Sequence, residues 1–557
     1  MNSICRALAV GASVAMLITT QGYGQTKPSV PKNWQLLSYE ADSVYGIGVE
    51  KAYRELLKGK TGKTVIVAVI DSGVDTTHED LRSILWRNPN EIPGNNIDDD
   101  GNGYVDDIYG WNFLGAKDGS SVKEDSDEAT REFYRYKRLY GDPDSALQPG
   151  TKEYAYWTRL KDRSQKPSTQ AKTDYKMMLK VQENLLKCES VLSEYLKTSD
   201  FTKEQLDTLR GGDSDVMFAR GFALRLLGST GEEGMTYQAL KNDLGEYIKE
   251  LKKKAEVTGA EPVDKRTTIV GDNINDINDR YYGNNDVQGQ FAFHGTHVSG
   301  IIGAVRNNDA GMDGVADNVR IMTVKVVPEG DERDKDVALG IRYAVDNGAQ
   351  IINMSFGKGF SPQKQWVDDA IRYAQEKGVL LVHAAGNDGA NNDETENYPK
   401  DTFEDGKEAD NMITVGASSN GRVGSKIAGF SNYGKKEVDV FAPGVQIYST
   451  VPGGDKYGSA SGTSMASPVV AGLAAMILSY YPDLSARQLK QIIEKSATPL
   501  PDGQKVNKPG AKDEEIDFSE LSKSGGMVNA YEALRLAAKT KGENVKKNKG
   551  KVNLKKD

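Results

Sequence analysis

Histidine, the side chain best suited to proton transfer near neutral pH, is rare in this sequence. The chain has four histidines, and two of them, His294 and His297, share one Gly- and Ser-containing segment, Phe293 to Gly300. Asp71 follows an apolar run, and Ser464 precedes another. An acid, an imidazole and a hydroxyl in the chain order Asp, His, Ser can form a nucleophilic triad. Asp71, His294 and Ser464 follow this order and are therefore the candidate triad.

Ser464 has two interpretations. A Gly- and Ser-rich stretch, Gly453 to Gly462, leads to it, and an almost entirely apolar stretch, Val469 to Leu478, follows. This pattern predicts a loop and then a buried helix, with Pro468 close enough to the helix start to be tolerated. The hydroxyl could cap the helix. It could also be a nucleophile at a helix end that favours developing negative charge.

The histidines favour proton transfer over metal binding. His294 and His297 are three residues apart with no Glu between them. In the zinc-binding motif of metalloproteases, two His stand at i and i+4 on one helix, with a Glu between them. The other two histidines, His78 and His383, also precede Ser464. An α/β-hydrolase places its histidine after its serine, so that class is excluded.

The elements that must position these residues alternate between strand and helix. Val65 to Ile70 is a continuous apolar run, typical of a strand buried on both faces of a parallel sheet, and Asp71 would stand at its carboxyl end, where functional groups gather. The pattern predicts an α/β fold with a mostly parallel central sheet and helices on both faces. Five later strands are expected at Ile321–Val327, Gln350–Phe356, Val379–Ala384, Met412–Ala417 and Val438–Ala442, and helices at Val337–Asn347 and Gln363–Lys377.

An acidic loop follows the first strand. Asn96, Asp98, Asp100, Asn102 and Asp107 supply oxygen atoms around a central glycine, in a spacing close to that of a calcium loop. Asn stands at position 1 and Asp at position 12, where Asp and Glu are usual. The alternative is an acidic surface turn. We expect a structural Ca²⁺ site.

Composition divides the 557 residues into five parts. Residues 1–25 resemble a cleavable signal peptide, and residues 539–557 form a Lys-rich tail expected to be disordered. Residues 26–115 and 266–538 carry the motifs. Residues 116–265 are dense in charged side chains, and we expect them to form a mostly helical insertion.

The same composition limits the partners and the location. Beyond the leader only Cys188 remains, so no internal disulfide can form, and no second long apolar run predicts a membrane span. A net charge of −9 argues against nucleic acid as the main partner. We expect an exported protein, either periplasmic or extracellular.

These motifs together resemble the subtilisin-like serine proteases, or subtilases. The resemblance covers Lys63–Ile108 and about Phe291–Ala538, and it implies a three-layer subtilisin-like fold. The matching segments are Asp71–Asp75 with His78–Leu81, His294–Val298, Asn353–Gly357, Ala384–Asn387, Ala442–Gly444 and Gly462–Pro468.

The resemblance implies a serine endopeptidase that acts on polypeptides. Ser464 would attack the carbonyl, His294 would transfer the proton, Asp71 would orient His294, and Asn387 with the Ser464 N–H would stabilise the oxyanion. The edge along which an extended substrate pairs would be formed by Ser355, Phe356, Gly357 and Gly386. A large apolar residue is expected before the scissile bond, although Asp388 could favour a basic one.

The resemblance also implies a second Ca²⁺ site, at Asp80 and Asn308. One departure is that fewer than fifty residues separate Gln25 from Asp71, which leaves little room for the usual pro-domain. The insertion could therefore assist folding or gate the cleft. The alternative function is a catalytically silent, calcium-dependent binding protein on a protease scaffold.

Overall fold

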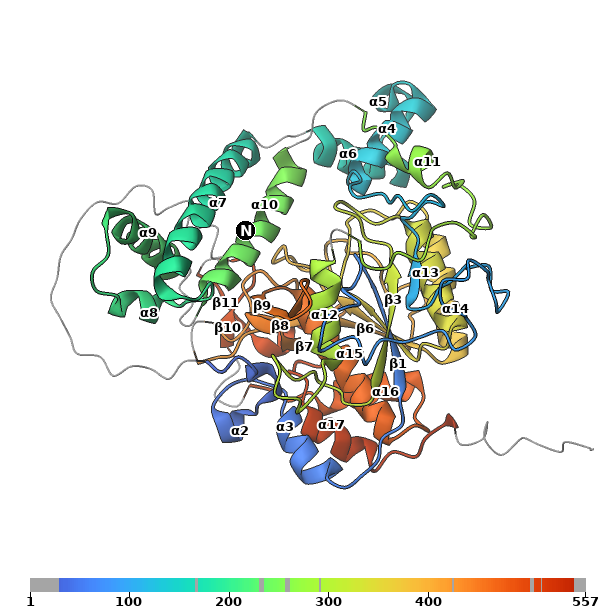
Figure 1. Ribbon diagram of the computed structural model, residues 1–557. Helices are drawn as coiled ribbons and strands as arrows, with labels where there is room; N and C mark the ends of the chain where they lie inside the picture. The colour runs from blue at the N-terminus through green and yellow to red at the C-terminus, as the bar shows by residue number, and fades with distance from the viewer. Residues whose placement is uncertain are drawn as a thin grey trace, which may run out of the picture.

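A seven-stranded parallel sheet forms the centre of the protein (Figure 1). The computed structural model describes residues 30–165, 169–229, 235–255, 261–289, 292–422, 425–500, 505–511 and 513–544. The strand order is β2-β3-β1-β4-β5-β6-β7, and every pair in it is parallel. The strands are β1 (Val65–Asp71), β2 (Gly110–Asn112), β3 (Val319–Lys325), β4 (Ile351–Met354), β5 (Leu380–Ala384), β6 (Met412–Ser418) and β7 (Val440–Pro443).

Alternate residues of β1 face two different apolar layers, as expected for a strand buried on both sides. Val65, Val67 and Val69 belong to the cluster that includes helices α12 (Phe293–Gly303) and α15 (Thr463–Tyr480). Ala68 and Ile70 belong to the cluster that includes helices α13 (Asp334–Asp346) and α14 (Lys364–Lys377). The predicted α/β fold with helices on both faces is therefore confirmed.

The N-terminal residues are part of this domain. Trp34 and Ile47 are buried in the same apolar cluster as α15, and the amide of Ala530 donates to the carbonyl of Ile47 at 2.7 Å. The short elements here are η1 (Trp34–Leu36), α2 (Tyr39–Asp42), α3 (Val49–Ala52) and η2 (Tyr53–Leu57). Of these, α3 and η2 pack against the C-terminal helix α17 (Ala530–Ala537), which contacts α16 (Ala486–Ser496) in turn; α16 begins with a Ser485–Gln488 capping box.

Five small elements after β7 were not expected from the sequence. The hairpin of β8 (Ile447–Val451) and β9 (Lys456–Ala460) leads directly to α15. A second two-stranded sheet pairs β10 (Lys505–Asn507) with β11 (Glu515–Asp517), followed by η3 (Phe518–Glu520).

The segment between β2 and α12 is mostly helical, as predicted. Its helices form two groups, on the left and at the top of Figure 1. One apolar core joins α7, α8, α9 and α10, and another joins α4, α6 and Phe360 of the catalytic domain. The helices are α4 (Glu128–Tyr140), α5 (Pro143–Ala146), α6 (Lys152–Gln165), α7 (Thr169–Leu196), α8 (Lys203–Thr208), α9 (Ser214–Ser229), α10 (Tyr237–Ala255) and α11 (Lys265–Ile269).

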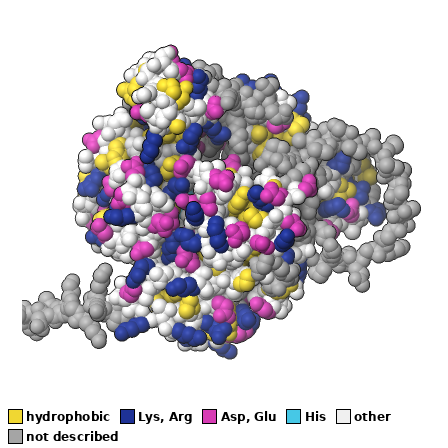
Figure 2. Space-filling view, turned by 180° about the vertical axis from the view of Figure 1, so that it is seen from behind, with side chains coloured by type: hydrophobic (Ala, Val, Ile, Leu, Met, Phe, Trp, Pro, Cys, Tyr) yellow, Lys and Arg dark blue, Asp and Glu magenta, His cyan; other side chains and the backbone are white. Residues whose placement is uncertain are grey.

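Hydropathy and charge agree with a globular protein. Within the described ranges one helix, α15, is long and apolar enough to cross a membrane, and 89% of that stretch is buried inside the protein. It is a core helix. On the face seen in Figure 2, positive and negative side chains are interspersed over the coloured surface. The predicted leader, residues 1–25, and most of the predicted tail lie outside the described residues.

Candidate active site

Asp71 and His294 meet where β1 ends and α12 begins. The Nδ1 atom of His294 lies 2.8 Å and 3.0 Å from the two carboxylate oxygens of Asp71, which is 1% exposed. A carboxylate only accepts hydrogen bonds, so Nδ1 carries the proton and Nε2 is the basic nitrogen. A Cβ atom on Gly295 would lie 2.2 Å from the carbonyl oxygen of Gly73, so glycine allows α12 to approach the strand end.

Ser464 lies in the first turn of α15 and is tied to the end of β4. Its Oγ donates to the carbonyl oxygen of Ser355 at 3.0 Å, and the Ser355 hydroxyl donates to the carbonyl of Ser464 at 2.9 Å. Strands β1 and β4 are neighbours, with Ile70 opposite Met354. Asp71, the last residue of β1, and Ser355, the residue after β4, therefore lie at adjacent strand ends. Asp71 binds His294, and Ser355 binds Ser464.

The amide of Asn387 is fixed by the residue before Ser464. Its Oδ1 accepts hydrogen bonds from the backbone N–H of Thr463 at 2.9 Å and from the Thr463 hydroxyl at 3.0 Å. A Cβ atom built on Gly462 would lie 3.6 Å from both Asn387 Nδ2 and the Ser464 nitrogen. Two N–H donors thus border the same small space, which glycine leaves open. Such a pair suits an oxyanion.

The predicted substrate-binding residues lie at the ends of two neighbouring strands, β4 and β5. The Gly386 N–H donates to the Thr463 hydroxyl at 3.1 Å. The carbonyl of Phe356 accepts from Nε2 of His383 at 2.8 Å, and a Cβ on Gly357 would lie 2.6 Å from Asn397 Oδ1. Both segments are therefore held close to Ser464 by contacts that leave no room for larger residues at Gly357.

The other three histidines, His78, His297 and His383, are buried, and the Nε2 atom of each lies within hydrogen-bond distance of a backbone carbonyl. His297 is fully buried, its Nε2 lies 3.1 Å from the carbonyl of Gly458, and burial lowers its pKa to about 3. Burial likewise lowers the pKa of His383 to about 4. Both rings are neutral at physiological pH, so each donates from Nε2 to a backbone carbonyl. His294 differs from them because its partner is a carboxylate.

The family model described as "Subtilase family" matches residues 62–516, which include every residue discussed in this section. The chain belongs to the subtilase family. It is a serine endopeptidase, and the resemblance inferred from the motifs is confirmed.

Several curated relatives are bacterial subtilases. The chain is 43% identical to subtilisin DY of Bacillus licheniformis over 213 residues, which are 38% of this chain and 72% of that protein. It is 42% identical to a thermophilic serine proteinase of Bacillus sp. (strain AK1), over 37% of this chain and 46% of that protein. A solved structure titled "Proteases from Pseudoalteromonas arctica PAMC 21717" is 29% identical, covers 46% of this chain and 74% of that chain, and has a TM-score of 0.35.

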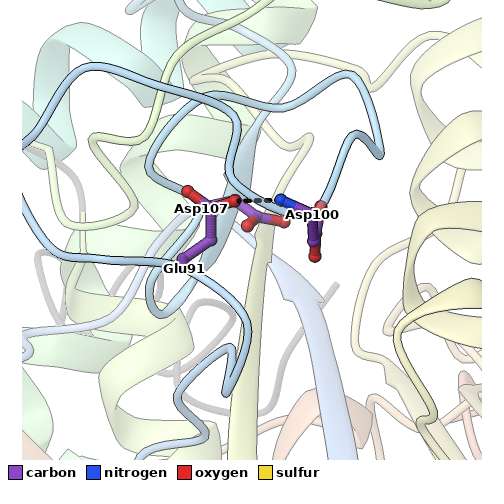
Figure 3. Close-up of side chains that lie close together, drawn as sticks. All are labelled: Glu91, Asp100 and Asp107. Carbon is purple, nitrogen blue, oxygen red and sulfur yellow. Dashed lines mark hydrogen bonds between the residues drawn. The ribbon is translucent and has the colours of Figure 1, made fainter.

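The acidic loop of this subtilase brings three carboxylates together. The carboxylate oxygens of Glu91, Asp100 and Asp107 lie within 4.8 Å of one another (Figure 3), and the Asp100 N–H donates to Glu91 at 3.3 Å. Burial raises the pKa of Asp107 to about 6, although Tyr343 donates a hydrogen bond to it at 2.6 Å. Crowded carboxylate oxygens of this kind, two of them from the buried residues Glu91 and Asp107, suit a hard divalent cation.

The loop differs in part from the predicted ligand set. Asp98 accepts backbone N–H groups from Asn102 and Gly103, and Asn102 donates its amide to Asp107 at 3.2 Å. Asn96 has a positive φ of 58°, and its N–H donates to Asp106. Glu91 precedes the loop, and no spacing rule identified it; its burial appears only in the folded chain.

The second predicted site contains a residue that the sequence did not suggest. Asp80 is fully buried and accepts a hydrogen bond from the amide of Asn308 on one oxygen. The hydroxyl of Tyr457, from β9, lies 2.9 Å from the other oxygen of Asp80 and 2.9 Å from Glu79, so its one proton is shared between the two carboxylates. Both oxygens of Asp80 therefore have hydrogen-bond donors within the protein.

Proposed function

We propose that this subtilase hydrolyses peptide bonds through Asp71, His294 and Ser464 by way of an acyl-enzyme. Ser464 Oγ attacks the carbonyl carbon while His294 Nε2 takes its proton. The C–N bond then breaks as His294 returns that proton to the leaving amine, and water repeats the sequence to release the acid. The support is the register of β1 against β4, because Asp71 binds His294 and the adjacent Ser355 binds Ser464.

The oxyanion would be held by Asn387 Nδ2 and the Ser464 N–H. The support for this role is that both donors border the space above Gly462. An extended substrate would pair with Ser355, Phe356 and Gly357, and Gly386 would border the same pocket. Phe356 is half-buried, which is compatible with a large apolar residue before the scissile bond.

We further propose that the acidic loop binds Ca²⁺ through Glu91, Asp100 and Asp107. Three acids this close repel one another, and burial penalises the charges of Glu91 and Asp107, so a divalent cation would offset both effects. The ion would cross-link the loop and would take no part in the reaction. Asp80 and Asn308 fit a second ion less well, because their hydrogen bonds to each other and to Tyr457 would have to rearrange.

The location proposed for the enzyme is outside the cytoplasm. The apolar stretch from Ala7 to Thr19 supports export. The competing function is a silent, calcium-dependent binding protein on the same scaffold.

A fluorophosphonate probe separates the two functions, because it reacts only with an activated serine. We expect the wild type to be labelled at Ser464 and to cleave a peptide library, and Ser464→Ala to do neither. His294→Ala should retain Ser464 but lose labelling by several orders of magnitude. An unlabelled wild type that still binds polypeptide in a calcium-dependent manner would favour the binding protein.

A further inference from the structure

Helix α10 of the insertion lies against β9, the strand that leads to Ser464 (Figure 1). Asn242 donates its side-chain amide to the carbonyl of Ser459 at 2.8 Å. The neighbouring Asp243 accepts the backbone N–H of Ser461 at 3.1 Å. Two consecutive side chains of the insertion therefore bind the main chain three to five residues before the proposed nucleophile.

These two backbone groups are the ones that another strand would use. In a parallel ladder one residue pairs with a carbonyl and with the amide two positions later on its neighbour. Strand β8 occupies the opposite edge of β9, with Ile447 facing Ala460. The side chains of α10 thus occupy the outer edge, and they leave no room for an added strand there.

Further hydrogen bonds fix the main chain between Ser461 and Ser464. The N–H of Gly462 donates to the carbonyl of Gly444 at 2.8 Å, and the N–H of Thr463 donates to Asn387. The hydroxyl of Ser461 also accepts the N–H of Gln446 at 2.9 Å. The path of the chain into α15 is therefore set by contacts from three directions, and the insertion supplies one of them.

We propose that Asn242 and Asp243 are positioning residues that set the approach of Ser464 to the proposed oxyanion site. This inference rests on the proposed function. The residues act through the backbone of residues 459–463, which carries the Ser464 N–H and fixes Asn387 through Thr463. A displacement there changes the alignment of nucleophile and oxyanion donor, whereas the substrate edge after β4 stays in place.

Kinetics of full-length variants test this with a matched control. We expect Asp243→Ala and Asn242→Ala each to lower kcat for a peptide substrate about tenfold, with KM within about twofold. Asp243→Asn keeps an oxygen acceptor for the Ser461 N–H, so it should retain most of the activity. Lys241→Ala is the control, because Lys241 pairs at 2.7 Å with Glu189 inside the insertion, and its kcat should be unchanged.

Hydrogen exchange supplies a readout that does not depend on activity. The Ser461 amide should exchange at least about tenfold faster in Asp243→Ala than in the wild type or Lys241→Ala. Unchanged exchange, unchanged kcat in Asp243→Ala, or an equal loss in Lys241→Ala would each overturn the inference. If Asp243→Ala shows faster exchange than the wild type, but the wild type is not labelled by the fluorophosphonate, the proposed catalysis is contradicted. The anchoring of this backbone by Asp243 would still hold.

Discussion

Asn387 uses the two ends of one amide for different purposes. Its oxygen accepts from Thr463, and its nitrogen borders the space beside the Ser464 N–H. Because the oxygen is committed to the backbone, the NH₂ group is held toward the proposed oxyanion before any substrate arrives. Preorganised donors of this kind need no reorientation during the reaction.

Replacing Asn387 by Asp should separate these purposes. Asn387→Asp keeps an acceptor for Thr463 but removes the donor and adds a negative charge. We expect kcat to fall by at least about 10²–10³-fold, the range known for loss of such a donor in a subtilisin, with KM little changed.

Steady-state kinetics with a peptide substrate measure this effect, and thermal unfolding checks that the variant is folded. Gly221→Ala, on an open face of α9, is the control for activity. A variant that keeps wild-type kcat would exclude Asn387 from oxyanion stabilisation.

Residue types and chain order predicted the candidate triad, because Asp71, His294 and Ser464 each have a local signal. The contacts that bring these residues together have no local signal in the sequence. For example, the hydrogen bonds between Ser355 and Ser464 depend on the register of β1 and β4. Glu91 was missed for the same reason, since its neighbours in sequence give no sign that it is buried beside Asp107.

At the scale of elements, a buried lysine fastens the insertion to the proposed substrate edge. Lys358 follows Gly357, and its ammonium lies 2.6 Å from Glu128 of α4 and 2.8 Å from Asp334 of α13. Burial alone would raise the pKa of Glu128, but the charges of Arg131 and Lys358 hold it well below its ordinary value. The insertion thus contacts the catalytic domain beside Gly357 as well as beside Ser461.

Removing the charge of Lys358 should loosen this junction. Lys358→Met leaves Glu128 and Asp334 buried with one cation fewer, so we expect the free energy of unfolding to fall by about 3–5 kcal/mol. Lys407→Met is the control, because the Lys407 side chain is 75% exposed. Urea denaturation measures both. Equal stability of the two variants would mean that the buried ion pairs do not hold the junction.

Alternation of strands and helices predicted the sheet, because apolar runs closed by glycine are local features. The structure shifts the predicted strand Ile321–Val327 to Val319–Lys325 and ends the predicted strand Gln350–Phe356 at Met354. The β8–β9 hairpin lies in a stretch rich in Gly and Ser and had no apolar alternation to identify it. The docking of α10 on β9 joins residues 217 positions apart, which no local pattern encodes.

At the scale of the whole molecule, bound Ca²⁺ should make stability depend on pH in a particular direction. Without the ion, the folded pKa of Asp107, about 6, lies above the ordinary value of 3.8. The folded state therefore binds the extra proton between those values, and this contribution to stability is lost as pH rises toward 6. Calcium competes with the same proton, so its affinity should weaken about tenfold per pH unit below 6.

The unfolding midpoint with Ca²⁺ minus the midpoint with EGTA should thus be larger at pH 7.5 than at pH 5. Asp107→Asn should reduce the difference at pH 7.5 and remove most of its pH dependence. Differential scanning calorimetry at the two pH values measures both. A difference that is the same at pH 5 and pH 7.5 in the wild type would place the ion elsewhere.

The hydrogen bond between Asp71 and His294 joins residues 223 positions apart, with the helical insertion between them. Loop-closure entropy grows only with the logarithm of loop length, so making this connection about three times shorter would reduce its cost by only about 1 kcal/mol. The helices α7–α10 also have an apolar core of their own and can collapse through short-range contacts. The topology can therefore accommodate a long excursion between two strand ends without a large entropic penalty, and the length of that excursion can vary while the strand ends stay fixed.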